Sequence, residues 1–394
     1  MRITQNLEQN QFLTALNNLE SNIAQTQNDV STGLSFTTPA QNPQAAGTVD
    51  DLNQILSQSQ QYTANANSAQ TSLNTENDAL TQVQNQLQSL YSLTLEANSG
   101  TQSSQDLSSI AAQASQIQNT LLTLANTQDG NGQYIFAGYA TQTQPFNQTA
   151  TGVSYSGDSG QRQVQIAAGQ TIAAGDSGDT VFNSPTGNGT YTVTANANNT
   201  GSGLIGATTV TNAAAYTGGA YTISFTAANA YSINTVPPTT GTYTPGQALA
   251  FQGLQISLSG QPATGDSFQV APSTSQSLFT TVQNLVSTLQ AGIPSQGGQT
   301  QLSNSLAGDI NNLTQALDQS STLQAKVGAR LNTITTQLSV ATSQQTQLQT
   351  SISSLQSLDY ASAVTTLDSE NTQLSAAMQA FTLTQGLSLF KYIS

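Results

Sequence analysis

The side chains that usually carry out chemistry are scarce in this sequence of 394 residues. The chain contains neither His nor Cys, so it cannot form a Ser-His-Asp triad, a Cys-His pair, or a metal site built on imidazole or thiolate. Carboxylates, Tyr and Lys are the groups that remain for proton transfer. Motifs that look catalytic must therefore be judged on these groups.

Two copies of the tetrapeptide GDSG, at 157–160 and 175–178, resemble the sequence around serine-protease nucleophiles. Because no His can act as the base, we interpret both as turns in which Asp and Gly occupy favoured positions. The segment 201–206 spells G-x-G-x-x-G, but no helical pattern follows it and the next acidic residue is Asp266. A dinucleotide site needs a strand before the motif and a helix after it, so we expect none here.

The acidic residues do not suggest a metal site or a catalytic pair. Residues 129–132, and Asp176 with Asp179, lack the spacing of a calcium-binding loop, so turn chemistry is the better interpretation. Two further pairs fall on or beside predicted helices, where solvation at the helix surface would explain them: Asp50 with Asp51, and Glu76 with Asp78. We expect no catalytic residue, no metal and no cofactor, and therefore no enzyme.

The charge balance excludes several classes of partner. Charged residues make up 6% of the chain, with 5 Lys and Arg against 19 Asp and Glu, so few cations are present to meet nucleic acid or anionic lipid. No apolar run is long enough to span a membrane, and the N-terminus lacks the pattern of a cleavable signal peptide. A surface of amides and hydroxyls does not titrate, so we also expect packing to depend weakly on pH, which would fit a source that lives in acid.

Helices with coiled-coil spacing are predicted in the N-terminal part. Apolar residues alternate steps of four and three from Phe12 to Val30, and Gly33 is the expected stop. The same spacing runs from Tyr62 to Leu90 in one long helix, with Glu76 as a polar residue on the seam. A third helix covers 107–124. The stretch after it is predicted to be a turn at Asp129-Gly130 followed by an apolar strand.

The C-terminal part mirrors this pattern. A short helix over 278–289 is followed by heptads from Leu331 to Leu355. The heptads resume from Val364 to Phe381 after a phase skip at Asp359-Tyr360, which indicates a hinge or a local change in supercoil. Between the two helical parts, alternation of apolar and polar residues predicts strands over 162–167, 189–196, 220–227 and 254–260.

These elements predict an α+β multidomain protein, with an elongated helical coiled-coil rod formed by both termini and an inserted antiparallel β domain. The domains are expected to be a coiled-coil arm and loop (1–44), the two parts of the rod (45–139 and 276–358), the β domain (140–275) and a second arm (359–394). An amphipathic arm must bury its stripe against another helix. We expect an assembly interface, packing within and between subunits, at Leu7, Phe12, Leu16, Leu19, Ile23, Val30, Val364, Leu367, Leu374, Met378, Phe381, Leu387 and Phe390.

Several segments near both ends of the chain match one known family. They are MRITQNLEQNQFLTALNNLESNIAQTQNDVSTG, TPAQNPQAAGTVDDLNQIL, LANTQDGNGQYIFAGYATQTQPF, SGQPATGDSFQVAPSTSQSLFTTVQNLV and the final LSLFKYIS. Taken together they resemble the bacterial flagellin superfamily, and more closely its hook-associated protein 3 family of hook–filament junction proteins. The resemblance covers residues 1–146 and about 250–394.

The resemblance implies a secreted structural component of the bacterial flagellum, exported through the flagellar type III channel and needed for filament assembly and motility. It implies a homo-oligomeric ring or tube between a hook-associated partner and flagellin, an export chaperone, and terminal arms that are disordered in the free monomer. Two alternatives remain open. The chain could be a filament flagellin, which its ending disfavours, or a secreted carbohydrate-binding or hydrolytic β domain carried on helical arms.

Overall fold

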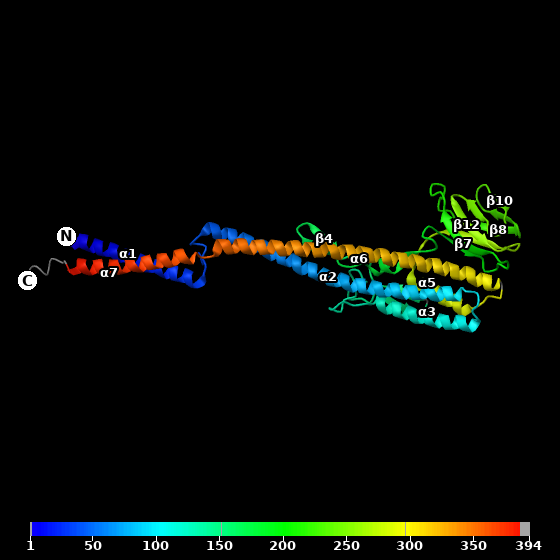
Figure 1. Cartoon of the computed structure of the whole chain (residues 1–394), viewed down its shortest axis with the longest axis horizontal. Coiled ribbons are helices and arrows are strands. Elements are labelled where there is room, and N and C mark those ends of the chain that lie inside the picture. The colour runs from blue at the N-terminus through cyan, green and yellow to red at the C-terminus, as the bar shows by residue number, and fades with distance from the viewer. Residues whose placement is uncertain (1, 151, 296, 387–394) are drawn as a thin grey trace, which may run out of the picture. The chain divides into compact units, whose positions relative to one another are not determined.

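The computed structural model describes residues 2–150, 152–295 and 297–386, and the chain divides into two compact units. The first unit combines Met1–Ala64 with Leu338–Ser394, and the second is Asn65–Gln337. Two long helices, α2 (Pro43–Ala97) and α6 (Gly298–Gln356), contribute residues to both units (Figure 1). None of the helices in the described ranges has an apolar stretch that would cross a membrane.

The first unit contains the helices nearest the two ends of the chain, α1 (Arg2–Thr32) and α7 (Tyr360–Gly386). Helix α1 ends where predicted, because Gly33 adopts a left-handed backbone conformation (φ +72°) that a residue without Cβ tolerates. The phase skip in the sequence is a break between α6 and α7, at which the Asp359 carboxylate accepts hydrogen bonds from the amides of Ala361 and Ser362.

The two breaks lie side by side within this unit. The amide of Ser35 donates to the carbonyl of Gln356 (2.7 Å), and the amide of Leu358 donates to the carbonyl of Gly33 (3.0 Å). These bonds satisfy backbone groups that the helix ends leave open. The chain leaves α1 and enters α7 through one shared junction.

The second unit contains the remaining helices, α3 (Ser104–Ala125), the one-turn α4 (Gly178–Val181) and α5 (Leu278–Ala291). Helix α3 begins with a capping box, in which Ser103 and Asp106 each satisfy the other's backbone amide. It packs against α5 (Figure 1). Helix α6 begins well before the predicted heptads at Leu331, because its earlier turns also bury a seam: Leu302, Leu306, Leu313, Leu323 and Val327.

The seam predicted for α2 forms part of the helical core of this unit. Its members are nearly inaccessible to solvent because α2 is covered along this face: Ala66, Ala69, Leu73, Glu76, Leu80, Val83, Leu87 and Leu90. Burial of such a stripe is what holds a long helix in place.

The β region of the second unit is antiparallel throughout, as predicted. The strands form a five-stranded sheet (β10-β9-β8-β13-β6), a three-stranded sheet (β11-β12-β7) and three two-stranded ladders (β1-β2, β3-β4 and β14-β5). Their bounds are β1 Phe146–Thr149, β2 Gly152–Tyr155, β3 Gln163–Ala167, β4 Gln170–Ala173, β5 Asn183–Pro185, β6 Tyr191–Ala195, β7 Leu204–Val210, β8 Tyr221–Ala227, β9 Ala230–Ile233, β10 Thr239–Thr242, β11 Ala248–Phe251, β12 Leu254–Ser259, β13 Ser267–Pro272 and β14 Ser275–Ser277.

One hydrophobic core joins the two larger sheets. Ile223, Phe225 and Phe268 from the five-stranded sheet pack with Leu254 and Ile256 from the three-stranded sheet. All four strands predicted from alternation are confirmed as β3, β6, β8 and β12. Strands β6, β8 and β12 alternate because one face of each larger sheet contacts this core, whereas β3 pairs with β4 in a separate two-stranded ladder.

The apolar strand predicted after Asp129-Gly130 is wrong. The turn is present, since the Asp129 carboxylate accepts hydrogen bonds from two following amides, but Phe136 and Ala137 lie buried in irregular chain. Phe136 joins an aromatic cluster, which we define as Phe136, Phe146, Tyr155, Phe182 and Phe279. Neighbouring ring centroids in this aromatic cluster are 5.0 to 5.7 Å apart. Packing of these rings, which come from four other elements or loops, explains why an apolar segment is buried without forming a strand.

Candidate assembly interface

The two terminal helices pack against each other in antiparallel directions within the first unit. The rings of Phe12 and Phe381 are stacked, with centroids 4.8 Å apart and an interplanar angle of 10°. Further along the pair, the hydroxyl of Thr26 donates to a carboxylate oxygen of Glu370 at 3.1 Å. The N-terminal and C-terminal arms are therefore partners in one chain.

Most of the predicted interface residues face the partner helix. Ile23 is buried, and the other members of this group are half-buried: Phe12, Leu16, Leu19, Val30, Leu367, Leu374 and Phe381. Three predicted residues remain exposed: Leu7, Val364 and Met378. Leu387 and Phe390 lie outside the described residues. The structure thus brings together most of the described seam residues that periodicity predicted and leaves Leu7, Val364 and Met378 exposed.

Helix α7 carries apolar residues at two neighbouring heptad positions. The inner seam, which we define as Leu367, Leu374 and Phe381, is half-buried, and the other position is exposed. Val364 and Met378 are two heptads apart, with exposed fractions of 45% and 52%, and Leu383 is 69% exposed. Sequence reasoning did not include Leu383, nor Leu13 of α1, which is 43% exposed. These two residues lie off the four-three spacing. A pair of helices with one half-buried seam and several exposed large apolar side chains has surface available for further helices.

The motifs that resembled chemistry have structural roles. Asp158 of the first GDSG accepts hydrogen bonds from the amides of Tyr139, Gly160 and Ala140, which lower the pKa of its carboxyl group. The G-x-G-x-x-G segment leads into strand β7 rather than a helix. The amide of its first residue, Gly201, donates to the carboxylate of Asp266, which is itself buried. A side chain of the protein itself occupies the place an anion would need.

The second GDSG copy is more than a turn. Its Asp176 is buried and accepts two hydrogen bonds from the guanidinium of Arg330 on α6, at 2.9 and 3.0 Å. Ser177, the next residue, caps α4 by accepting from the amide of Thr180. The loop between β4 and α4 is thereby tied to α6.

The interpretation of Glu76 as a solvated surface residue is wrong. Its side chain is 1% exposed, and one of its carboxylate oxygens accepts a hydrogen bond from the amide of Asp176 at 3.2 Å. Burial first, and the charge of Asp176 second, raise the pKa of Glu76 from 4.5 to about 8, although Arg330 opposes the shift. On α6, burial likewise raises the pKa of Asp309 to about 7. These two raised pKa values argue against the expectation that packing depends weakly on pH, which stays a prediction.

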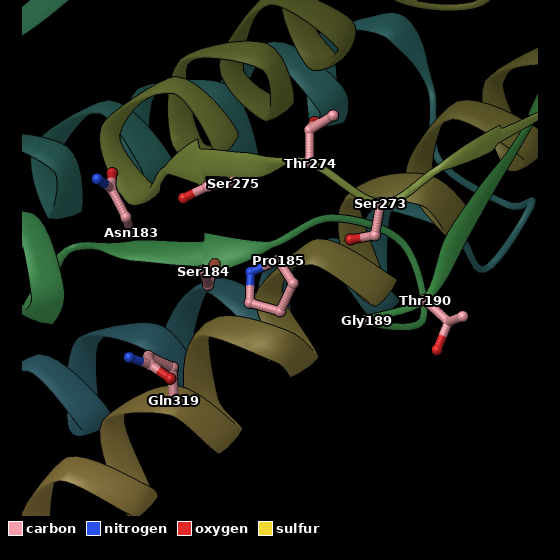
Figure 2. A pocket seen from close by; sticks show the side chains of 9 residues that line it. All are labelled: Asn183, Ser184, Pro185, Gly189, Thr190, Ser273, Thr274, Ser275 and Gln319. Atoms are coloured by element: carbon pink, nitrogen blue, oxygen red, sulfur yellow. The ribbon is translucent and has the colours of Figure 1, made fainter. Parts of the chain in front are cut away.

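An open recess of about 450 Å³ lies where the β5-β14 ladder meets α6 (Figure 2). Gln319 enters it from α6, and the residues that line it offer hydroxyl, amide and backbone groups: Asn183, Ser184, Pro185, Gly189, Thr190, Ser273, Thr274, Ser275 and Gln319. None of these nine side chains titrates in the physiological range. The recess can form hydrogen bonds but has no group in its lining for general acid–base chemistry.

Two family models match this chain and show the class of protein to which it belongs. Residues 3–141 match the bacterial flagellin N-terminal helical region, and residues 185–272 match the D2-like domain of flagellar hook-associated protein 1. The second match falls on the β region and includes the stretch from 185 to about 250 that the sequence resemblance left uncovered. A helical N-terminal region of this kind, paired with a C-terminal helix and carrying an inserted β domain, defines a flagellin-like protein.

The relatives identify the family more narrowly. Over 188 residues the chain is 34% identical to flagellar hook-associated protein 3 of Salmonella typhimurium and 32% identical to that of Escherichia coli. Each of these alignments covers 48% of this chain and 59% of the relative's length. The crystal structure of Xanthomonas campestris FlgL is 30% identical with a TM-score of 0.71, covering 77% of this chain and 99% of that one. The flagellar junction protein FlgL from Legionella pneumophila is 26% identical, also with a TM-score of 0.71, covering 79% and 100%. The chain belongs to the flagellar hook-associated protein 3 (FlgL) family.

Proposed function

We propose that this chain is a structural subunit of the bacterial flagellum, placed at the junction between hook and filament and required for filament assembly and motility. The observation that carries the proposal is the pair of terminal helices, which leaves large apolar side chains exposed in a chain of this family. The subunit acts outside the cell, after export through the flagellar type III channel with the help of a chaperone. Its role is structural, and it performs no catalysis.

The exposed apolar surface of α7 also indicates what this subunit would contact in the assembly. Val364 and Met378 project from α7 on the side next to the inner seam, so helices of neighbouring subunits can cover them. Burying each such side chain contributes roughly 1.5–3 kcal/mol. We infer that copies of this chain form a ring or tube through these arms, with a hook-associated protein on one side and flagellin on the other.

The two alternatives have less support. A filament flagellin would polymerise with itself into long filaments, whereas the relatives from Salmonella, Escherichia and Xanthomonas described above, each aligned at 30% identity or more, are named hook-associated protein 3 or FlgL. A hydrolytic β domain would need a pair of carboxyl groups across a cleft. The recess of Figure 2 is lined by neutral groups.

The test is complementation of a strain that lacks this gene. A V364N/M378Q variant should be exported but should leave hooks without filaments and cells that do not swim, as scored by electron microscopy and spreading in soft agar. The control is T365N/Q379N, which changes exposed polar residues at the same spacing on α7 and should restore motility. Normal filaments with V364N/M378Q would contradict the proposed interface, and normal filaments in the deletion strain itself would contradict the proposed function.

A further inference from the structure

Three charged side chains from distant parts of the sequence meet inside the second unit. Glu76 comes from α2, Asp176 from the loop between β4 and α4, and Arg330 from α6. The guanidinium of Arg330 donates two hydrogen bonds to the carboxylate of Asp176, and a carboxylate oxygen of Glu76 accepts a hydrogen bond from the backbone amide of Asp176. Both acidic residues are buried, Glu76 with 1% and Asp176 with 5% of its surface exposed to solvent.

The charges in this cluster do not balance when both carboxyl groups are ionised. One guanidinium then faces two carboxylates, and it already forms its hydrogen bonds with Asp176. The second oxygen of Glu76 is buried without a hydrogen-bond partner. An unpaired carboxylate in such a place is strongly disfavoured, whereas its protonated form is a neutral group that burial tolerates better.

Among residues 2–150, 152–295 and 297–386, no further charged group compensates Glu76. The charges that act on it are those of Asp176 from the loop and Arg330 from α6. Arg162 lines the same small cavity as Asp176, but its guanidinium donates to the side chain of Gln133. On α2 itself, Asp78 is exposed to solvent. Protonation of Glu76 is therefore the means by which this cluster becomes neutral.

We propose that Glu76, Asp176 and Arg330 form a proton-operated latch, in which a proton on Glu76 holds the loop 174–177 against α2 and α6 and loss of that proton releases the loop. The loop leads directly into the aromatic cluster, because the amide of Gly178 donates to the carbonyl of Phe136 and Phe182 follows α4. Release of the loop would therefore loosen the attachment of this cluster to the long helices.

The direction of the pH dependence follows from linkage. The raised pKa means that the closed state binds the proton of Glu76 more tightly than the open state, in which the carboxyl returns toward 4.5. The latch is therefore closed in acid and weakens as the pH rises from about 4.5 through 8. Above that range both states have lost the proton, and the weakening stops.

Hydrogen–deuterium exchange on the full chain tests the latch. The variant E76Q keeps the shape of the protonated side chain but cannot ionise. In peptides that cover 170–182, the ratio of wild-type to E76Q exchange rates should rise by up to about tenfold per pH unit between 5 and 8, then level off. Comparing the two proteins at one pH cancels the chemical effect of pH on exchange.

The matched control is D78N, which removes a carboxylate from an exposed position two residues further along α2 and should exchange like wild type at every pH. A ratio that stays constant from pH 5 to 8, or a D78N profile that matches E76Q, would overturn the proposal. Should E76Q fail to fold, carbon-13 NMR of the five glutamate carboxyl groups in the wild-type chain still decides. One of them must titrate above pH 7, and the absence of such a resonance refutes the latch.

Discussion

Phe12 and Phe381 stack ring on ring, which joins residues near opposite ends of the chain. The stack lies on the same helix pair as the hydrogen bond between Thr26 and Glu370, so two separate contacts define the antiparallel register of α1 and α7. This register distinguishes residues that the chain covers by itself from those it leaves for neighbours. Ile23 and Phe381 belong to the first group, and Met378 belongs to the second.

Cross-linking tests this register directly, because the chain has no Cys of its own. A T26C/E370C variant should be bridged within one chain by a short thiol-reactive cross-linker such as dibromobimane, since the native side chains at these positions are in hydrogen-bonding contact. The pair Q27C/E370C is the control, because Gln27 is an exposed neighbour of Thr26 on α1. Gel mobility and mass spectrometry of the monomer report the result, and equal cross-linking of both pairs would show that the register is not maintained.

The aromatic cluster requires a residue without a side chain at Gly178. A Cβ at this position would lie 2.6 Å from a ring carbon of Phe146 and 2.7 Å from one of Tyr155. G178A should lower the free energy of unfolding by about 1–3 kcal/mol, because the rings must move to accept the methyl group. The matched change G308A, inside α6 with no side chain or other segment within 4 Å of the new Cβ, should instead raise it by up to about 1 kcal/mol. Urea unfolding followed by circular dichroism measures both changes.

The buried side-chain amide of Asn304 on α6 forms two hydrogen bonds with the inserted β domain. Asn304 donates to the carbonyl of Gly203 at 2.9 Å and accepts from the amide of Ile205 at 2.8 Å. N304A removes both bonds and leaves two backbone groups without partners, so the free energy of unfolding should fall by about 1–3 kcal/mol. N311A, at an exposed position on the same helix, should change it by less than about 0.5 kcal/mol. Equal effects of the two variants on the urea midpoint would contradict this role for Asn304.

Periodicity predicted the parts of the fold whose burial depends on local spacing. The α2 seam from Ala66 to Leu90 and the alternating strands follow from residues close in sequence, so they could be recognised without knowledge of the partner surfaces. The early turns of α6 were missed because Gly308, Asp309 and Ser320 interrupt the apolar pattern there.

Burial that depends on distant residues could not be predicted in the same way. Glu76 lies on the seam of α2 like its apolar neighbours, but only the arrival of Asp176 and Arg330 makes it a buried, interacting group. Phe136 is buried by rings from other segments and needs no strand to achieve this. In the assembly interface, the four-three spacing identified the seam between α1 and α7 but not the exposed Leu13 and Leu383, which lie beside it.

Asp309 places a buried carboxyl group without a charged partner in the helical core. It is 7% exposed, and one of its oxygens is buried without a hydrogen-bond partner. Because burial raises the pKa of Asp309 from 3.8 to about 7, its contribution to stability is fully present below pH 4 and is lost as the pH rises to about 7. The slope should approach roughly 1.4 kcal/mol per pH unit within that window.

Replacing Asp309 by Leu should remove this slope and make the chain more stable than wild type at pH 8, because no buried charge then forms. The measurement is urea unfolding between pH 4 and 8 in the E76Q background, which removes the contribution of Glu76 from the comparison. D318N is the control, since Asp318 is exposed on the same helix and its loss should leave the slope intact. A D309L/E76Q chain that keeps the slope of E76Q alone would show that the pKa of Asp309 is the same in the folded and unfolded chain.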